Sequence, residues 1–151
     1  MHSRISRSRS PQSEAKLSVV LQEDVDGVWP LAERHLLKSY RSNDQNIPIN
    51  LRLDLRRGIR QLWLVTRGDV TIIAAGVTAI HELRSGNVLK IEQFGGSSMG
   101  EWLHLLEEVE AYARSQGCKK VMWEGRRGWT RLLADYEVSA WTMEKRLDDD
   151  G

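Results

Sequence analysis

The stretch IEQFGGSSMGEWLHLLEEVEAYARSQG, residues 91–117, decides the fold, because it links an apolar segment to an amphipathic one through a short joint. This joint, residues 93–98, contains two adjacent glycines and two serines. The residues after the joint repeat apolar side chains at helical spacing, so we expect a helix over residues 99–116 that Gly117 ends. The predicted buried stripe of this helix is Trp102, Leu106, Val109 and Ala113.

The joint allows two interpretations, and the sequence supports both. Its glycines leave backbone N–H groups open to an anion at the start of a helix. Ser98 and Glu101, however, have the spacing of a capping box, which satisfies the same donors without a ligand. Glu101 would also repel a phosphate by roughly 4 kcal/mol at about 4 Å and an effective dielectric constant near 20. Residues 93–101 contain no basic side chain, so Arg126 and Arg127 are the nearest candidates to offset this repulsion.

The segments around this stretch predict a mixed sheet. Three β-rich runs, residues 62–66, 70–80 and 88–94, are separated by the turn sequences RGD and RSGN, which is typical of an antiparallel meander. Residues 119–125, KKVMWEG, then predict a strand after the helix, which makes a β-α-β crossover. The sequence also predicts a short helix over residues 129–136 and a final strand over residues 138–147.

The N-terminal third predicts a strand at residues 17–22 and a helix ending near Tyr40, with Pro30 in its first turn. Residues 47–57 fit two structures. Apolar and polar residues alternate there as in a half-buried strand, yet Leu51 and Leu55 also fit one face of a helix capped by Asn50. Both alternatives stay open at the level of sequence.

Composition indicates one globular domain of 151 residues with 40% hydrophobic and 28% charged residues. We expect an Arg/Ser-rich flexible tail at residues 1–16, the domain at residues 17–147 and an acidic end at residues 148–151. A formal net charge of +1 gives no electrostatic reason to expect nucleic acid or an anionic membrane as a partner. A single cysteine, Cys118, indicates no internal disulfide, and a cytoplasmic location is the simplest interpretation. The histidine spacing suggests no metal site.

The element order predicts a mixed α/β domain whose mainly antiparallel central sheet has helices on both faces. With the glycine-containing joint before a long helix, residues 17–147 resemble the GNAT superfamily of acyl-CoA-dependent N-acyltransferases. More narrowly, GVWPLAERHLLKSY (27–40), RQLWLVTRG (60–68) and the GRRGW segment (125–129) are similar to small GNAT-like proteins of phages and prophages.

The resemblance implies that acetyl-CoA is a co-substrate whose pyrophosphate binds the backbone of the joint. In the family's pattern Gln93 takes the first place and Gly96 the fourth, while Ser98 stands where glycine or alanine is expected. The implied cofactor-binding residues are Gln93, Phe94, Gly95, Gly96, Ser97, Ser98, Arg126 and Arg127.

The catalytic residues are less completely matched. The family's tyrosine, which protonates the departing thiolate, falls at Arg131 or Leu132 here, and we expect Tyr136 to be a core residue. Glu92 and Glu124 are the candidates for a general base that deprotonates an amine. The expected function is therefore acetyl transfer from acetyl-CoA to an unidentified amine. The alternative is a catalytically degenerate GNAT-fold binding or scaffold protein of phage or prophage origin. The family resemblance also implies a possible homodimer, with the C-terminal strand in the dimer contacts.

Overall fold

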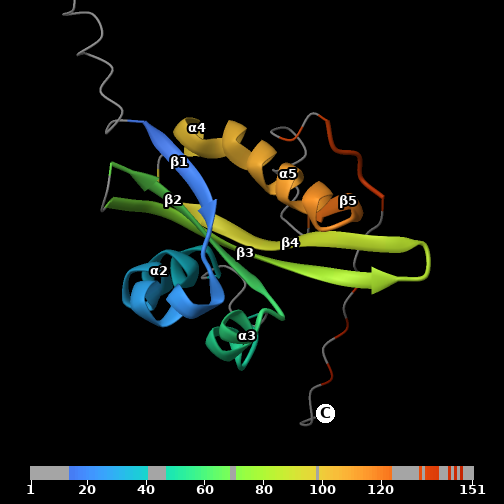
Figure 1. The fold of residues 1–151 in the computed structure, drawn as a ribbon, viewed down its shortest axis with the longest axis horizontal. Coiled ribbons are helices and arrows are strands. Elements are labelled where there is room, and N and C mark those ends of the chain that lie inside the picture. Colours follow the sequence, from blue (N-terminus) through green and yellow to red (C-terminus); the bar gives the residue numbers. More distant parts are fainter. Residues whose placement is uncertain are drawn as a thin grey trace, which may run out of the picture.

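The computed structural model describes residues 14–40, 47–68, 71–97, 99–123, 133, 135–139, 143, 145 and 147. Within these described residues, a five-stranded sheet in the order β1-β2-β3-β4-β5 lies between two layers of helices (Figure 1). This arrangement confirms the predicted mixed α/β fold with helices on both faces. Among the described residues, no helix has the length and apolar character needed to cross a membrane.

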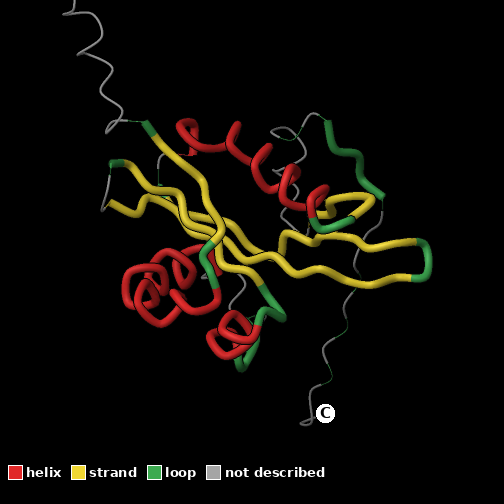
Figure 2. Tube along the Cα trace, viewed as in Figure 1, coloured by secondary structure: helices red, strands yellow, loops and turns green. Residues whose placement is uncertain are grey.

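Four antiparallel strands and one parallel strand form the sheet. The antiparallel strands are β1 (Ala15–Val19), β2 (Gln61–Arg67), β3 (Thr71–Leu83) and β4 (Gly86–Gly96). The last strand, β5 (Cys118–Trp123), runs parallel to β4. The predicted meander and β-α-β crossover are therefore confirmed. β2 ends its pairing with β3 at Thr78, so the β3–β4 hairpin projects beyond β1 and β2 (Figure 2).

One face of the sheet is covered by α2 (Val25–Tyr40), which follows the short 3-10 helix η2 (Gln22–Asp24), and by α3 (Leu51–Arg57). The helical alternative for residues 47–57 is thus the correct one, because Leu51 and Leu55 both reach the core and Gly58 ends the helix at a φ of 79°. The expectation that Pro30 lies in a first turn was wrong. α2 begins at Val25, whose side chain is buried, and Pro30 is inside the helix.

The other face is covered by α4 (Met99–Trp102), the 3-10 segment η4 (Leu103–Leu106) and α5 (Glu107–Ser115). The sequence predicted one continuous helix here, and the η4 segment corrects that. The indole of Trp102 bonds back to Ser97, so the first turn is tied to the end of β4 before the chain continues along the sheet. The four predicted stripe residues are all buried, and Gly117 follows α5 with a φ of 77°, as expected.

Each face of the sheet has its own apolar core. Under α4 and α5 the sheet contributes large side chains such as Trp63, Leu89, Ile91 and Phe94. Under α2 and α3 it contributes smaller ones, including Leu62, Leu64, Ala75 and Val77. Of the predicted helix at residues 129–136 and the predicted final strand at residues 138–147, the structure describes residues 133, 135, 136, 138, 139, 143, 145 and 147, and none of these described residues lies in a helix or strand.

Candidate functional site

The edge of β4 beyond its last described pair with β5, which we call the fork, is the feature on which the candidate site is built. The two strands pair from Asn87 to Ile91 on β4, and the last pair is Ile91 with Trp123. β4 continues to Gly96 while paired with β3. Within the described part of the chain, no strand pairs with the other edge of residues 92–96, and this edge is the fork.

A β-bulge marks the position where the fork opens. Gln93 pairs with Val77 and Ile91 pairs with Thr78, which leaves Glu92 as the extra residue between them. Bulges of this kind bend a strand and redirect a side chain, and they are common beside functional sites. The bulge therefore places the predicted general base Glu92 at the base of the fork.

The Glu92 carboxylate is held by Arg60, which lies just before β2. Arg60 Nε donates to Glu92 Oε1 at 2.7 Å and Nη2 donates to Oε2 at 3.5 Å, while Nη1 donates to Asp54 on α3. The three side chains are only 16–23% exposed. Burial lowers the pKa of Arg60, but the bonds to Glu92 and Asp54 outweigh it, and the net pKa lies above the ordinary value.

The joint differs from the sequence expectation, because the strand does not end near Phe94. Gly95 and Gly96 continue the β3 ladder opposite Ala75 and Ala74. The reason is a close approach of the two backbones, since a Cβ at Gly96 would lie 2.2 Å from the carbonyl oxygen of Ile73. The glycine at position 96 thus has a structural cause that needs no ligand.

Backbone directions at the joint follow from this ladder. Ser97 N–H donates to Ile73 O at 2.8 Å, and its hydroxyl donates to the same oxygen at 3.4 Å. In an antiparallel ladder every second residue directs its N–H to the same neighbour. The N–H of Gly95 therefore points toward β3 as that of Ser97 does, whereas those of Phe94 and Gly96 point toward the fork.

Phe94 has a buried side chain, and its backbone faces the fork. Its ring stacks on Trp102 at 5.2 Å and on Trp123 at 6.4 Å between centroids. It also lies over Gly76 of β3, where a Cβ would come within 2.2 Å of the ring. Phe94 therefore joins β4, α4 and β5 into one core, and any role in binding would come from its backbone.

Glu101 has a basic partner that the sequence did not reveal. Its carboxylate accepts a hydrogen bond from Arg67 Nη2, which reaches it from the end of β2. The expectation that Arg126 and Arg127 were the nearest basic side chains is corrected for the described residues by this contact. Both side chains are exposed, and pairs of this kind contribute about 0–1 kcal/mol to stability.

Several of the predicted residues lie outside the described part of the chain or away from the joint. Ser98, Glu124, Arg126 and Arg127 lie outside the described residues. Tyr136 donates its hydroxyl to Glu110 Oε2 of α5 at 2.9 Å, and burial together with this carboxylate raises the pKa of Tyr136, so it keeps its proton. Burial also raises the pKa of the Cys118 thiol.

Sequence reasoning missed three residues that surround the site, namely Asp54, Arg60 and Arg67. Each contacts a carboxylate or an arginine that is 6 to 34 positions away in sequence. No local sequence motif predicts ion pairs between residues so far apart in the sequence. The sequence offered one signal. Arg60 and Arg67 lie just outside the two ends of the strand predicted at residues 62–66, where the neighbouring predicted strands also begin or end.

Several solved structures with a similar fold are described as acetyltransferases. An aminoglycoside acetyltransferase from an uncultured soil metagenomic sample, in complex with sisomicin, aligns with a TM-score of 0.68 at 11% identity, over 89% of this chain and 97% of that one. The aminoglycoside N-acetyltransferase AAC(6')-Iy, in complex with CoA, aligns with a TM-score of 0.61 at 13% identity, over 89% and 95% of the two chains. The chain has the GNAT-like fold.

A third similar structure widens the range of activities carried by this fold. Glucosamine-6-phosphate N-acetyltransferase from Arabidopsis thaliana aligns with a TM-score of 0.59 at 18% identity, over 89% of this chain and 99% of that one. No protein-family model and no curated protein sequence matches the chain. The fold prediction is thus confirmed, and the narrower similarity to phage and prophage proteins stays a prediction.

Proposed function

We propose that this protein is an acyl-CoA-dependent N-acyltransferase that moves an acetyl group from acetyl-CoA to an amine. The observation that carries the proposal is the fork, the edge of β4 beyond its last described pair with β5, with Glu92 at its base and the joint at its far end. The similar structures support it, because one holds CoA and others act on amino sugars.

The edge of β4 offers a place for the pantetheine arm of acetyl-CoA. Phe94 and Gly96 direct their N–H groups toward the fork, and an extended ligand with amide groups can bind such an edge as an added strand. In this arrangement the acetyl end reaches the bulge, and the phosphates lie at the joint. Gln93, Ser98, Arg126 and Arg127 keep their proposed places around the phosphates. Gly95 and Ser97 direct their N–H groups toward β3, so the backbone donors of the joint that remain for a ligand are those of Phe94 and Gly96.

The proposed reaction needs one base. The amine nitrogen attacks the acetyl carbonyl carbon, a new C–N bond forms, and the C–S bond breaks to leave the CoA thiolate. Glu92 or Glu124 takes the proton from the amine directly or through water, and the thiolate takes up a proton from solvent. The hydrogen bond from Arg60 fixes the orientation of the Glu92 carboxylate at the base of the fork.

A specific observation favours a second function, that of a GNAT-fold binding or scaffold protein without the chemistry. Glu92 is already bonded to Arg60, and three stacked aromatic rings pack beside the fork. Such a protein would keep the fold and have no use for acetyl-CoA.

Thermal unfolding with acetyl-CoA separates the two functions. Under the transferase proposal, a ligand concentration about 100 times Kd should stabilise the protein by roughly 2.7 kcal/mol. A panel of amines with detection of released thiol then identifies the acceptor. The absence of any thermal shift at millimolar acetyl-CoA would contradict the transferase proposal and favour the binding protein.

A further inference from the structure

We propose that Arg67 is a phosphate-binding residue for acetyl-CoA and that Glu101 holds this arginine in place until the phosphates displace it. This inference rests on the proposed function, since it concerns how the same site accepts its co-substrate. It assigns a role to a contact between the β2–β3 hairpin and the first turn of α4, which sequence reasoning did not foresee.

Both members of the pair lie at the same end of the sheet as the joint. Arg67 is the last residue of β2 and stands opposite Thr71 at the start of β3. Ser97 of the joint donates its N–H to Ile73, two residues further along β3. Glu101 follows the joint by one helical turn. The guanidinium group therefore lies against the first turn of α4, at the end of the joint where we place the phosphates.

The contact between the two side chains is one that a ligand can replace. Glu101 accepts from one nitrogen of Arg67, and the two side chains are 35% and 49% exposed. A guanidinium group has five N–H donors in a planar fork, and phosphate oxygens match that fork in a bidentate manner. A phosphate can thus make the stronger contact, and the Glu101 side chain can turn toward solvent.

The pair also changes the electrostatics of the joint. Glu101 without a partner would repel an incoming phosphate, as the sequence suggested, but Arg67 neutralises it while the site is empty. Once the phosphates pair with Arg67, the Glu101 carboxylate moves away from the guanidinium group. Glu101 is therefore one half of an exchangeable ion pair and not an unpaired, repulsive charge. The affinity for CoA then depends on the competition between Glu101 and phosphate for Arg67.

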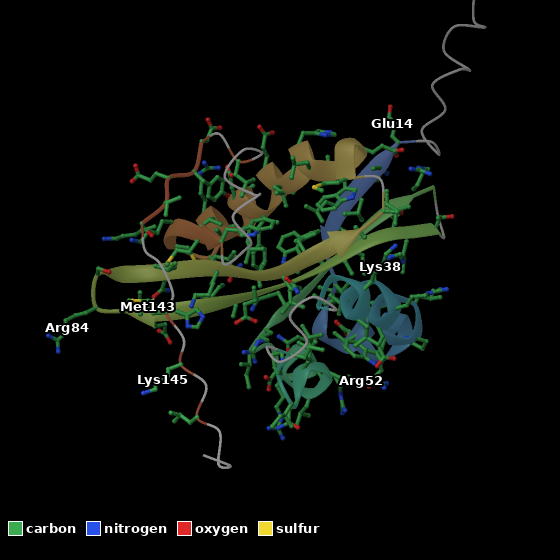
Figure 3. All side chains as sticks on the ribbon, turned by 180° about the vertical axis from the view of Figure 1, so that it is seen from behind. Glu14, Lys38, Arg52, Arg84, Met143 and Lys145 are labelled. Atoms are coloured by element: carbon green, nitrogen blue, oxygen red, sulfur yellow. The ribbon has the colours of Figure 1, made fainter. Side chains whose placement is uncertain are left out.

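Isothermal titration of CoA into the wild type and into R67Q and E101Q tests this competition. R67Q should weaken CoA binding by about tenfold, because a charge-assisted contact to phosphate is lost. E101Q should tighten it several-fold, because the competitor is removed. The matched control is R52Q, which removes another exposed, ion-paired arginine (Arg52 with Asp26) on the opposite face of the sheet (Figure 3) and should leave the affinity unchanged.

Further ligands show which phosphate is bound. If R67Q weakens the binding of 3′-dephospho-CoA as much as that of CoA, Arg67 binds the pyrophosphate. If R67Q and the wild type bind 3′-dephospho-CoA equally well, Arg67 binds the 3′-phosphate. In both cases the loss should shrink as salt rises, since exposed charges are screened. Thermal unfolding of each variant without ligand checks that the fold is intact.

The outcomes separate this inference from the proposed function. If the wild type binds CoA and R67Q binds it equally well, the inference is wrong while the transferase proposal stands. An E101Q variant that binds CoA more weakly would also overturn it, because Glu101 would then assist rather than compete. If the wild type binds no CoA at millimolar concentration, the proposed function fails and the inference fails with it.

Discussion

Two arginines lie at the two ends of β2, and they differ in how firmly their side chains are held. Arg60, just before the strand, is bonded to two carboxylates and is 23% exposed. Arg67, at the end of the strand, meets one carboxylate and is 35% exposed, beside a partner that is about half exposed. Part-buried charges lose much of their hydration and depend on each other, whereas exposed charges can exchange partners with solvent or ligand. Burial thus holds the first cluster, which includes the proposed base Glu92, firmly in place and leaves the second pair available to a ligand.

The largest expected effect comes from breaking the Arg60 cluster with R60Q. Glu92 and Asp54 would keep part-buried negative charges without their cation, and we expect a loss of about 2–3 kcal/mol in the free energy of unfolding. Urea unfolding measures this loss. The matched control is R56Q, because Arg56 pairs with Asp26 at 3.4 Å with both side chains about half exposed. An R60Q variant no less stable than R56Q would remove the contrast between the two arginines.

A smaller effect should follow from D54N, which tests how the cluster is shared. The asparagine can still accept a hydrogen bond from Arg60, and Glu92 remains the second partner. We therefore expect a loss of about 1 kcal/mol, less than for R60Q, by the same urea measurement. If D54N costs as much as R60Q, then Asp54 rather than Glu92 is the main partner of the guanidinium.

The sequence predicts those parts of the molecule whose structure is decided by local interactions, and it misses those decided by contacts between distant segments. The buried stripe from Trp102 to Ala113 was predictable, because helix periodicity is a local property of the chain. The meander was predictable for a similar reason, since turn residues punctuate its β-rich runs. The ambiguity at residues 47–57 could not be resolved locally, because tertiary packing of Leu51 and Leu55 decides it.

The candidate site was predictable only as a set of positions along one strand. Glu92 and the joint could be chosen from the pattern around the glycines, but the bulge depends on registry with β3. Gly96 was interpreted as a sign of ligand binding, whereas the approach of Ile73 already requires a glycine there. Arg60 and Arg67 were missed because ion pairs between distant segments leave no periodic signal.

The smallest effect should come from R67Q in the absence of ligand, and this prediction tests the contrast most directly. Because the pair with Glu101 is exposed, the free energy of unfolding should change by no more than about 0.5 kcal/mol. A double-mutant cycle with E101Q in urea should give a coupling energy of similar size. A coupling well above 1 kcal/mol would mean that the pair fastens α4 to the sheet as Arg60 fastens Glu92. Phosphate could then reach Arg67 only by destabilising the start of the helix, and the two arginines would no longer represent different kinds of site.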